Sequence, residues 1–538
     1  MASSIVPQLA ANSPPPPDYY AENLRQLITH VHAHYGDVLR REEIGYGRRI
    51  VACSVPAQRL YARLLSRRGP WIRIDKLRYR EVSDVTTAVG ELEEAGLVVR
   101  NGRAPADALL GLLSTAERRE LFAAIGDAPK ARWINQCVAR YSDAHVLSRL
   151  AGVHPWVSIR DFPTFWLHQL LFFGDTRQDL SAFVLQDLGL VRYEPYELDP
   201  RHRQFANRER LDEYLRYLEL SSLSYRLEEQ PVLASWLSGA MWTEPASRWA
   251  QRSRDKTANR LGRWHERRGE YDQALASYAR STSHPARERT ARILDRLGDA
   301  EGVQDVLHAM LSEPRSAEEE DFARRFGPNG RRKRHAHRLE RLPDGDGVRV
   351  EQLAVDLLTE GGGRGWHLEN RFSLGLAGLA FWPVVFADVP GAFVNPFQQG
   401  PVDLFWPDFV EQRAGILEVQ LDKLAAQGGL ASVVMDTWRR KFGVANRLVS
   451  WAHFDEDLLE AVLGQLPQGD LLRLADFTLR NLHRLRKGFP DLLVIRAPGD
   501  YEFVEVKGPT DQLQPVQRIW LDALEELDLP ARVLRFKA

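Results

Sequence analysis

The residues Asp491, Glu505 and Lys507, close to the C-terminus, have the types expected of a metal-assisted hydrolytic site. Two carboxylates within reach of one another raise each other's pKa unless a cation lies between them. Oxygen ligands select a hard divalent cation, Mg²⁺ or Mn²⁺, which holds a phosphate oxygen and lowers the pKa of a bound water. A lysine on the same face would orient the attacking water or neutralise charge on the scissile phosphate. This combination predicts hydrolysis of a phosphodiester bond.

An antiparallel hairpin is the simplest structure that would bring these residues together. The segments 491–495 and 501–507 are rich in β-branched and aromatic residues, and the turn sequence Pro498-Gly499-Asp500 separates them. A turn centred there places Asp491 opposite Lys507. Because side chains alternate along a strand, a small shift in register would still leave the three charged groups on one face, with the valines between them on the other.

A further acidic residue, Glu369, comes just before an apolar segment, residues 372–387, that we expect to form a buried helix. The segment contains Pro383 and is shorter than the ~20 residues of a membrane-spanning helix. Glu369 would lie at the start of the helix, where the helix dipole alone also favours an acidic residue. Glu369 is therefore a candidate metal ligand with a competing structural explanation.

Basic residues in two segments predict contacts with phosphates. One group precedes Asp491, on what we expect to be a helix leading to the hairpin, and the other lies among aromatic residues between positions 63 and 80. The DNA-binding candidates are Arg480, Arg484, Arg486 and Lys487 in the first group and Arg63, Arg68, Lys76 and Arg78 in the second. A solvent-exposed basic face is the alternative explanation for both groups.

The N-terminal half has the patterns of small helical modules. Residues 19–40 have helical spacing of apolar positions, and residues 88–99 predict a helix, a glycine and a short strand, as in a winged helix. Between Leu261 and Tyr278, small and aromatic residues have the spacing of a tetratricopeptide helix pair, and residues 289–311 repeat the outline less closely. Ordinary packing of helices would explain this pattern too.

Size and composition set further limits. A chain of 538 residues is expected to form three or four domains, and a polar, arginine-rich stretch, residues 314–347, predicts one boundary. The 72 Lys and Arg balance 73 Asp and Glu, so affinity for nucleic acid must come from local basic faces. Two cysteines are too few for a disulfide framework or a thiolate zinc site, and no export signal is visible, which favours a reducing cytoplasm.

The predicted catalytic residues and their surroundings resemble those of known nucleases. Pro490-Asp491 followed by Glu505-Val506-Lys507 resembles the motif of the PD-(D/E)xK nuclease superfamily, and residues 508–521 are similar to its virus-type replication-repair nuclease (VRR-NUC) subgroup. Over its whole length the chain resembles a bacterial member of the Fanconi-associated nuclease family. The segments that carry this likeness are residues 54–61, 269–271, 401–404 and 485–521.

The resemblance implies a multidomain, mostly α-helical protein. We expect a helical, winged-helix or SAP-like N-terminal DNA-binding part, a tetratricopeptide-like helical part and a C-terminal α/β core of the PD-(D/E)xK type. The expected boundaries are 1–70 for the tail and first helical region, 71–155 for the SAP-like or winged-helix region, 156–345 for the tetratricopeptide-like domain and 346–538 for the VRR-NUC domain.

The resemblance also assigns roles to individual residues. The implied metal ligands are Glu369, Asp491, Glu505 and the carbonyl of Val506. Lys507 becomes the catalytic lysine, and Gln517 matches the family's glutamine after the motif. Asp403 matches a family residue as well, but capping of a turn would explain it, so we leave Asp403 outside the site.

The implied function is that of a structure-specific nuclease. It would use Mg²⁺ or Mn²⁺ to cleave 5′ flaps and to degrade strands from 5′ ends during repair of interstrand crosslinks. Its partner would be branched or flapped DNA, with no membrane involved. The ubiquitin-binding zinc finger of eukaryotic members is not expected, because two distant cysteines cannot build one. We expect a monomer in the cytoplasm, associated with the bacterial nucleoid.

Two other functions stay open. A Holliday-junction resolvase or restriction-type endonuclease uses the same core, usually as a dimer, whereas the large helical part of this chain favours an enzyme that cuts one strand. A non-catalytic DNA-binding scaffold is the alternative from another class. The joint presence of Asp491, Glu505 and Lys507 argues against the scaffold.

Overall fold

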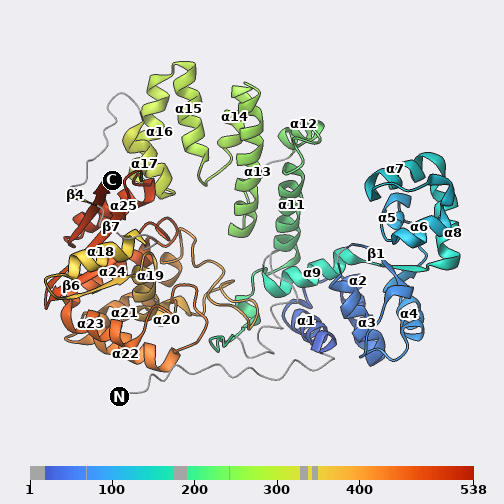
Figure 1. The fold of residues 1–538 in the computed structure, drawn as a ribbon, viewed down its shortest axis with the longest axis horizontal. Helices are drawn as coiled ribbons and strands as arrows, with labels where there is room; N and C mark the ends of the chain where they lie inside the picture. The colour runs from blue at the N-terminus through green and yellow to red at the C-terminus, as the bar shows by residue number, and fades with distance from the viewer. Residues whose placement is uncertain are drawn as a thin grey trace. The chain divides into compact units, whose positions relative to one another are not determined.

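The computed structural model describes residues 19–67, 69–174, 191–240, 243–326, 337–341 and 349–537. The proline-rich tail, Arg68 and part of the basic stretch, residues 327–336 and 342–347, fall outside these residues. The described chain is mostly helical, with two small sheets (Figure 1). It divides into two compact units, the first made of residues up to 192 with 198–204 and the second of residues 193–197 with 205 onward.

The first unit contains the predicted N-terminal helix. α1 (Tyr19–Tyr35) buries Leu24, Leu27, Ile28 and Val31, which recur at helical spacing and form one face. The helix ends five residues before the predicted end, in a turn that leads to α2. The other helices of this unit are α2 (Arg41–Ala52), α3 (Val55–Leu65), η1 (Ile74–Lys76), α4 (Val85–Glu94), α5 (Ala106–Leu110), α6 (Thr115–Leu121), η2 (Ala123–Ile125), α7 (Lys130–Arg140), α8 (Asp143–Val153), α9 (Phe162–Phe173) and η3 (Pro200–His202).

A three-stranded antiparallel sheet completes the first unit. The predicted helix, glycine and strand are α4, Gly96 with a φ of 68° and β2 (Val98–Arg100). β3 (Trp156–Ile159) lies between β1 (Trp71–Arg73) and β2. The middle strand thus comes from a later part of the chain than the two strands it joins.

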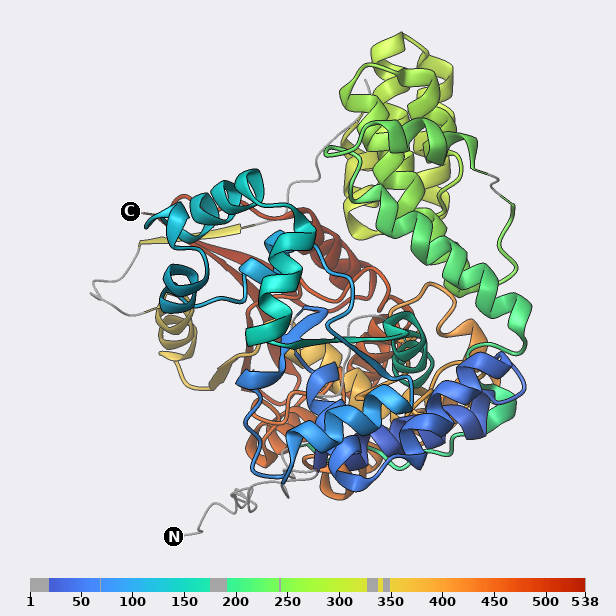
Figure 2. The same ribbon diagram turned by 90° about the vertical axis from the view of Figure 1, so that its right-hand side faces the viewer.

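Paired helices form the first part of the second unit. They are α11 (Arg208–Ser224), α12 (Val232–Gly239), α13 (Arg248–Arg267), α14 (Tyr271–Tyr278), α15 (Ala286–Leu297), α16 (Ala300–Ser312) and α17 (Ala317–Arg325). α13 with α14 and α15 with α16 are the two predicted tetratricopeptide-like pairs, and they stack in sequence order (Figures 1 and 2). Gly262 permits the close approach of α13 and α14, because a Cβ at this position would lie 2.7 Å from the Tyr278 ring.

A five-stranded sheet forms the centre of the C-terminal domain, in the order β4-β8-β7-β6-β5. The strands are β4 (His337–Arg341), β5 (Arg364–His367), β6 (Leu492–Ala497), β7 (Asp500–Lys507) and β8 (Ala531–Lys537). β5, β6 and β7 pair antiparallel, whereas β8 runs parallel to both β7 and β4. The sheet is therefore mixed, with the predicted hairpin near its middle.

Helices cover both faces of this sheet. α18 (Val350–Thr359) packs against Val504 and Val506, which point away from the charged residues of β7 as predicted. The other face packs through Leu493 and Phe503 against a larger core. The helices of that core are α19 (Arg371–Ala380), α20 (Trp382–Val385), η4 (Glu411–Arg413), α21 (Ala414–Ala425), α22 (Gly429–Lys441), α23 (Glu456–Gln465), α24 (Gln468–Arg480) and α25 (Pro515–Glu526).

The hairpin of β6 and β7 is confirmed, but its register differs by two residues from the predicted one. Leu492 pairs with Val504, so Asp491 comes level with Glu505 rather than with Lys507. The difference arises because the turn closes between Ala497 and Asp500, and an irregularity before Ala497 shifts the pairing further. Because the shift is an even number of residues, the alternation of faces is preserved.

The apolar segment 372–387 forms two helices, α19 and α20, and not the single helix predicted. Pro383 lies in the first turn of α20, where the missing N–H of proline loses no helical hydrogen bond. None of the helices in the described part of the chain has the length and hydropathy of a membrane span.

Gly262→Val should destabilise the paired helices, because the new side chain would overlap the Tyr278 ring, whose hydroxyl donates to Glu266 at 2.9 Å. Overpacking of this kind costs about 1–3 kcal/mol. Gly464→Ala in α23 is the matched control, since no atom lies within 4 Å of its added Cβ, and it should be neutral or slightly stabilising. Thermal unfolding compares the variants, and equal melting temperatures would contradict the close approach of α13 and α14.

Candidate active site

Asp491 joins two strands and a turn at the centre of the candidate site. Its side-chain Oδ2 accepts a hydrogen bond from the backbone N–H of Val506 in β7, at 2.9 Å. Its backbone carbonyl accepts hydrogen bonds from the N–H groups of Leu368, at 2.9 Å, and Glu369, at 3.0 Å. These bonds hold the turn between β5 and α19 against the start of β6.

Glu369 lies in that turn, and the prediction that it begins a helix is wrong. Its φ is 46°, in the left-handed region, and α19 begins only at Arg371. The helix dipole therefore does not account for the glutamate. Its carboxylate instead lies near Asp491 and His367: one ligand atom from each of the three residues lies within 4.8 Å of the other two.

Glu505 forms a second cluster beside the first. Its side chain is 1% exposed, and its Oε1 lies 2.7 Å from the ammonium of Lys507. The side-chain amide of Gln517, in the first turn of α25, donates to the same oxygen at 2.5 Å. The oxygen of that amide accepts from the backbone N–H of Gln514 at 2.9 Å, which fixes the orientation of Gln517. β7 and α25 thus bring Glu505, Lys507 and Gln517 together.

Burial raises the pKa of both central carboxyl groups. For Asp491, loss of hydration is the main cause, and the Val506 N–H and Lys507 oppose it. Burial and the neighbouring charge of Asp491 raise the pKa of Glu505 to about 7, although Lys507 acts in the other direction. The Oε2 of Glu505 is buried and has no hydrogen-bond partner in the described part of the chain. This donor set fits a divalent cation, which would neutralise the acids and occupy the free oxygen.

The helix that carries Gln517 is held in place by residues of α17. Arg518 binds Asp321 through two contacts of 2.9 and 3.1 Å and donates to the carbonyl of Leu513 at 2.5 Å. Trp520, which is fully buried, donates from its indole nitrogen to the carbonyl of Lys487 at 3.1 Å. The position of Gln517 therefore depends on contacts outside the sheet.

The basic residues before Asp491 do not share one helix, because α24 ends at Arg480 and residues 481–491 form an irregular segment. Arg480 is paired with Asp476 at 2.8 Å, and Arg484 donates to the buried Glu320 of α17. Arg486 and Lys487 are exposed. In the described part of this segment the structure therefore leaves the last two most open to a ligand.

Among the basic candidates of the first unit, too, some are paired with carboxylates and others are exposed. Arg63 is paired with Glu81 at 2.6 Å and lies over the ring of Tyr20. Lys76 is 56% exposed and contacts Glu117 at 3.0 Å, and Arg78 is exposed. Arg68 lies outside the described residues. Of the three candidates that the structure describes, Arg78 and Lys76 face solvent.

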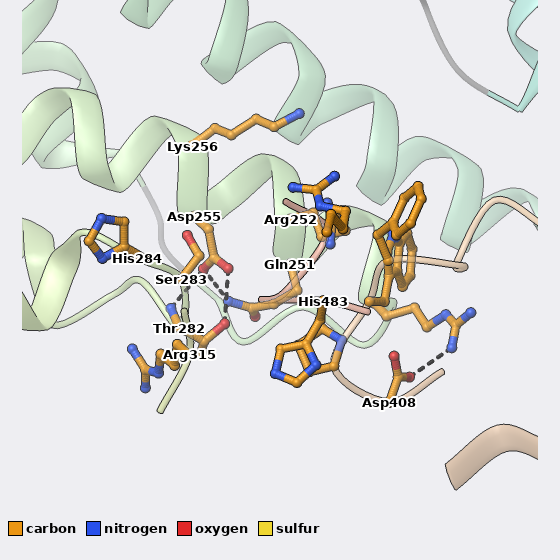
Figure 3. Close-up of a pocket in the computed structure, with 15 residues that line it drawn as sticks. Gln251, Arg252, Asp255, Lys256, Thr282, Ser283, His284, Arg315, Asp408 and His483 are labelled. Carbon is orange, nitrogen blue, oxygen red and sulfur yellow. Dashed lines mark hydrogen bonds and ion pairs between the residues drawn. The ribbon is translucent and has the colours of Figure 1, made fainter. Parts of the chain in front are cut away.

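A basic pocket of about 490 Å³ lies between α13 and the C-terminal domain (Figure 3). Its cations are Arg248, Arg252, Lys256, Arg315 and Arg486. Of its acids, Asp255 accepts from the backbone and side chain of Thr282, and Asp408 is paired with Arg248 at 2.7 Å. The three cations of α13 were not among the predicted site residues, although their spacing of four residues places them on one face of a helix.

His367 was not among the predicted site residues either. Its Nε2 lies 3.3 Å from Oε1 of Glu369, two residues away across the end of β5. A histidine next to a candidate metal ligand was a visible signal. Asp403, which we left outside the site as a possible turn cap, is fully buried and bound by Arg413 and Arg248 at 2.7–2.9 Å.

Comparison with known proteins places these residues in a family context. A family model described as "VRR-NUC domain" matches residues 425–538, and one described as "FAN1, HTH domain" matches residues 18–99. The Fanconi-associated nuclease 1 homolog of Pseudomonas aeruginosa is 31% identical in an alignment that covers 98% of this chain and 97% of the relative. The homolog of Arabidopsis thaliana is 26% identical, over 94% of this chain and 66% of the plant protein.

A solved structure agrees with the sequence comparison. It is described as "Crystal structure of paFAN1 bound to 2nt 5'flap DNA with gap" and matches with a TM-score of 0.84 and 28% identity. The match covers 98% of this chain and 99% of that one. The fold is thus shared from the N-terminal helices to the C-terminal sheet.

Glu505→Gln should raise the melting temperature of the metal-free protein near neutral pH. Because the fold raises the pKa of Glu505 from 4.5 to about 7, the metal-free protein loses stability as the pH rises through this range. A glutamine cannot ionise, so the variant should escape that loss and gain a few degrees above about pH 7, with little difference near about pH 4. Thermal unfolding in EDTA at several pH values tests this. A variant less stable than the wild type at every pH would contradict the electrostatic account.

Proposed function

The chain belongs to the Fanconi-associated nuclease family and is a DNA nuclease of the VRR-NUC type, and from this premise we propose that it cleaves 5′-flapped DNA and degrades strands from 5′ ends. Repair of interstrand crosslinks is the process that such an activity would serve. The observation that carries the proposal is the burial of Glu505 beside Asp491, with Lys507 on the same strand and with one oxygen of Glu505 unpartnered among the residues that the structure describes. A structural role alone would not favour such a costly arrangement.

The proposed ligands of the divalent cation, Mg²⁺ or Mn²⁺, are Glu369, Asp491, Glu505 and the carbonyl of Val506. When bound, the cation supplies a Lewis acid that stabilises charge on the phosphate. The N–H of Val506 holds the carboxylate of Asp491, and the amide of Gln517 orients that of Glu505. Lys507 is the group that we propose to hold the attacking water or the scissile phosphate.

We propose that DNA contacts the exposed cations of both units. Arg486 and Lys487 are exposed on the segment that leads to Asp491, and Lys76 and Arg78 are exposed in the N-terminal unit. For Arg63, Arg480 and Arg484, which are each paired with a carboxylate, contact with a phosphate would require exchange of that partner. Arg68 stays a prediction. We assign these contacts to branched or flapped DNA, because that class of substrate is bound by the solved relative.

The remaining proposals concern the protein as a whole. We propose a nuclease domain from residue 346 to the end of the chain, preceded by tetratricopeptide-like helices and an N-terminal DNA-binding part. We also propose that the protein acts as a monomer in the cytoplasm, at the nucleoid, without a ubiquitin-binding zinc finger. The two cysteines support the last point, because they are buried and free, and too few for such a finger.

The alternatives differ from this proposal in their products. A Holliday-junction resolvase or restriction-type enzyme would cut two strands symmetrically, usually as a dimer. A DNA-binding scaffold would bind without cutting. The raised pKa of Glu505, to about 7, favours an enzyme over a scaffold, because perturbed acids in contact with a lysine are typical of active sites.

Asp491→Ala and Lys507→Ala should each lower cleavage about 10³-fold or more, because they remove a metal ligand and the cation nearest the proposed reaction. DNA binding should stay within a few-fold of the wild type, since the exposed cations are untouched. Asp422→Ala and Lys423→Ala are matched controls, as both residues are exposed on α21. Single-turnover cleavage and fluorescence anisotropy measure the two properties. Full activity in either active-site variant would refute the assignment.

A panel of end-labelled 5′-flap, 3′-flap, four-way junction and linear duplex DNA should show fastest cleavage of the 5′ flap in Mn²⁺ or Mg²⁺ and none in EDTA. Products should shorten from the 5′ end. Paired symmetric cuts in the four-way junction would favour a resolvase, and tight binding with no cleavage of any substrate would favour a scaffold. Either result would overturn the proposed function.

A further inference from the structure

We propose that His367 is a nitrogen ligand of the divalent cation in this site and that it shifts the preference of the site from Mg²⁺ toward Mn²⁺. The inference rests on the proposed function, because it concerns the same cation. The ligands proposed above all bind through oxygen, so His367 would add a nitrogen ligand. A nitrogen ligand in turn predicts which of the two metals the enzyme prefers.

The geometry around the imidazole points to a missing cation. Nε2 of His367 is buried and has no hydrogen-bond partner among the described residues, although Oε1 of Glu369 lies 3.3 Å away. Ligand atoms of His367, Glu369 and Asp491 all lie within 4.8 Å of one another. Two converging carboxylates repel one another unless a cation lies among them, and an unprotonated imidazole nitrogen beside them can bind the same cation.

The backbone holds the imidazole in this position. The N–H groups of Leu368 and Glu369 both donate to the carbonyl of Asp491, at 2.9 and 3.0 Å. His367 itself ends β5, opposite Leu492 of β6. The histidine, the glutamate and the aspartate are therefore placed by one set of backbone bonds, and the site does not depend on a flexible loop to bring the histidine in.

A nearby histidine shows what a structural role looks like. His453 has both ring nitrogens engaged, Nδ1 with the hydroxyl of Ser450 at 2.9 Å and Nε2 with the guanidinium of Arg371 at 2.8 Å. His367 has no such pair of partners in the described part of the chain. We therefore assign a structural role to His453 and a ligand-binding role to His367.

The chemistry of the donor set gives the consequence for metal choice. Mg²⁺ prefers oxygen ligands and keeps its waters, whereas imidazole is a good ligand for transition metals and raises their affinity more than that of Mg²⁺. A mixed site of one imidazole and carboxylates should therefore bind Mn²⁺ more tightly than Mg²⁺, and the histidine should account for most of that difference.

The test uses the full chain loaded with Mn²⁺ in the absence of DNA. Electron spin echo envelope modulation should detect a directly bound imidazole nitrogen in the wild type and in His453→Ala, and should lose that signal in His367→Ala. By calorimetry, His367→Ala should weaken Mn²⁺ binding about tenfold and Mg²⁺ binding by less than about threefold. His367→Gln, which keeps the size and an oxygen, serves if the alanine variant does not fold.

The outcomes separate this proposal from the proposed function. No imidazole signal in the wild type, or an unchanged signal in the His367 variants, would overturn the role of His367. So would equal losses of Mn²⁺ and Mg²⁺ affinity. If Asp491→Ala still bound the cation and cleaved DNA as the wild type does, the metal site itself would be wrongly assigned, and the proposed function would fail with it.

Discussion

Glu505 is 1% exposed and lies beside Asp491, where burial raises the pKa of both carboxyl groups. The surrounding residues must compensate the negative charge of these two buried carboxylates. Lys507 supplies one positive charge at 2.7 Å, and the N–H of Val506 and the amide of Gln517 supply hydrogen bonds. Within the described ranges, one oxygen of Glu505 still has no hydrogen-bond partner. The negative charge of the two carboxylates is thus not fully compensated without a further cation. Their burial destabilises the metal-free fold, and the same burial favours binding of a divalent ion.

A second buried acid in the same domain, Asp403, has its charge compensated by protein side chains alone. Asp403 is fully buried, but Arg413 and Arg248 bind its two oxygens at 2.7–2.9 Å. This acid is saturated by arginines and ties α13 to the C-terminal domain. The neighbouring residues do not distinguish the two acids, since Asp403 and Glu505 both lie between apolar residues in the sequence. Their partners distinguish them, because arginines bind both oxygens of Asp403, whereas the Oε2 of Glu505 has no hydrogen-bond partner among the described residues.

The helical part of the second unit contributes to the site through α17. Three consecutive acids of this helix each bind an arginine of another element: Glu319 binds Arg287 of α15, Glu320 binds Arg484, and Asp321 binds Arg518 of α25. Arg518 follows Gln517, so the helix that orients Glu505 is anchored on the helical part. The same irregular segment that leads to Asp491 lines the basic pocket through Arg486. The helices thus both support the catalytic residues and bring cations to the region before them.

The sequence by itself determined the hairpin, the side of the sheet on which Asp491, Glu505 and Lys507 lie, and the tetratricopeptide-like pairing around Gly262, because these depend on local alternation, turn residues and helical spacing. It did not determine the register, which a bulge before Ala497 shifted, nor the conformation of Glu369, which precedes α19 in a left-handed turn. The tertiary structure alone decided which basic residues are neutralised by distant acids and that His367 faces Glu369 and Asp491. Arg484 and Glu320 are far apart in the chain, and so are His367 and Asp491, so these contacts depend on tertiary packing; only the closeness of His367 to Glu369 was visible in the sequence.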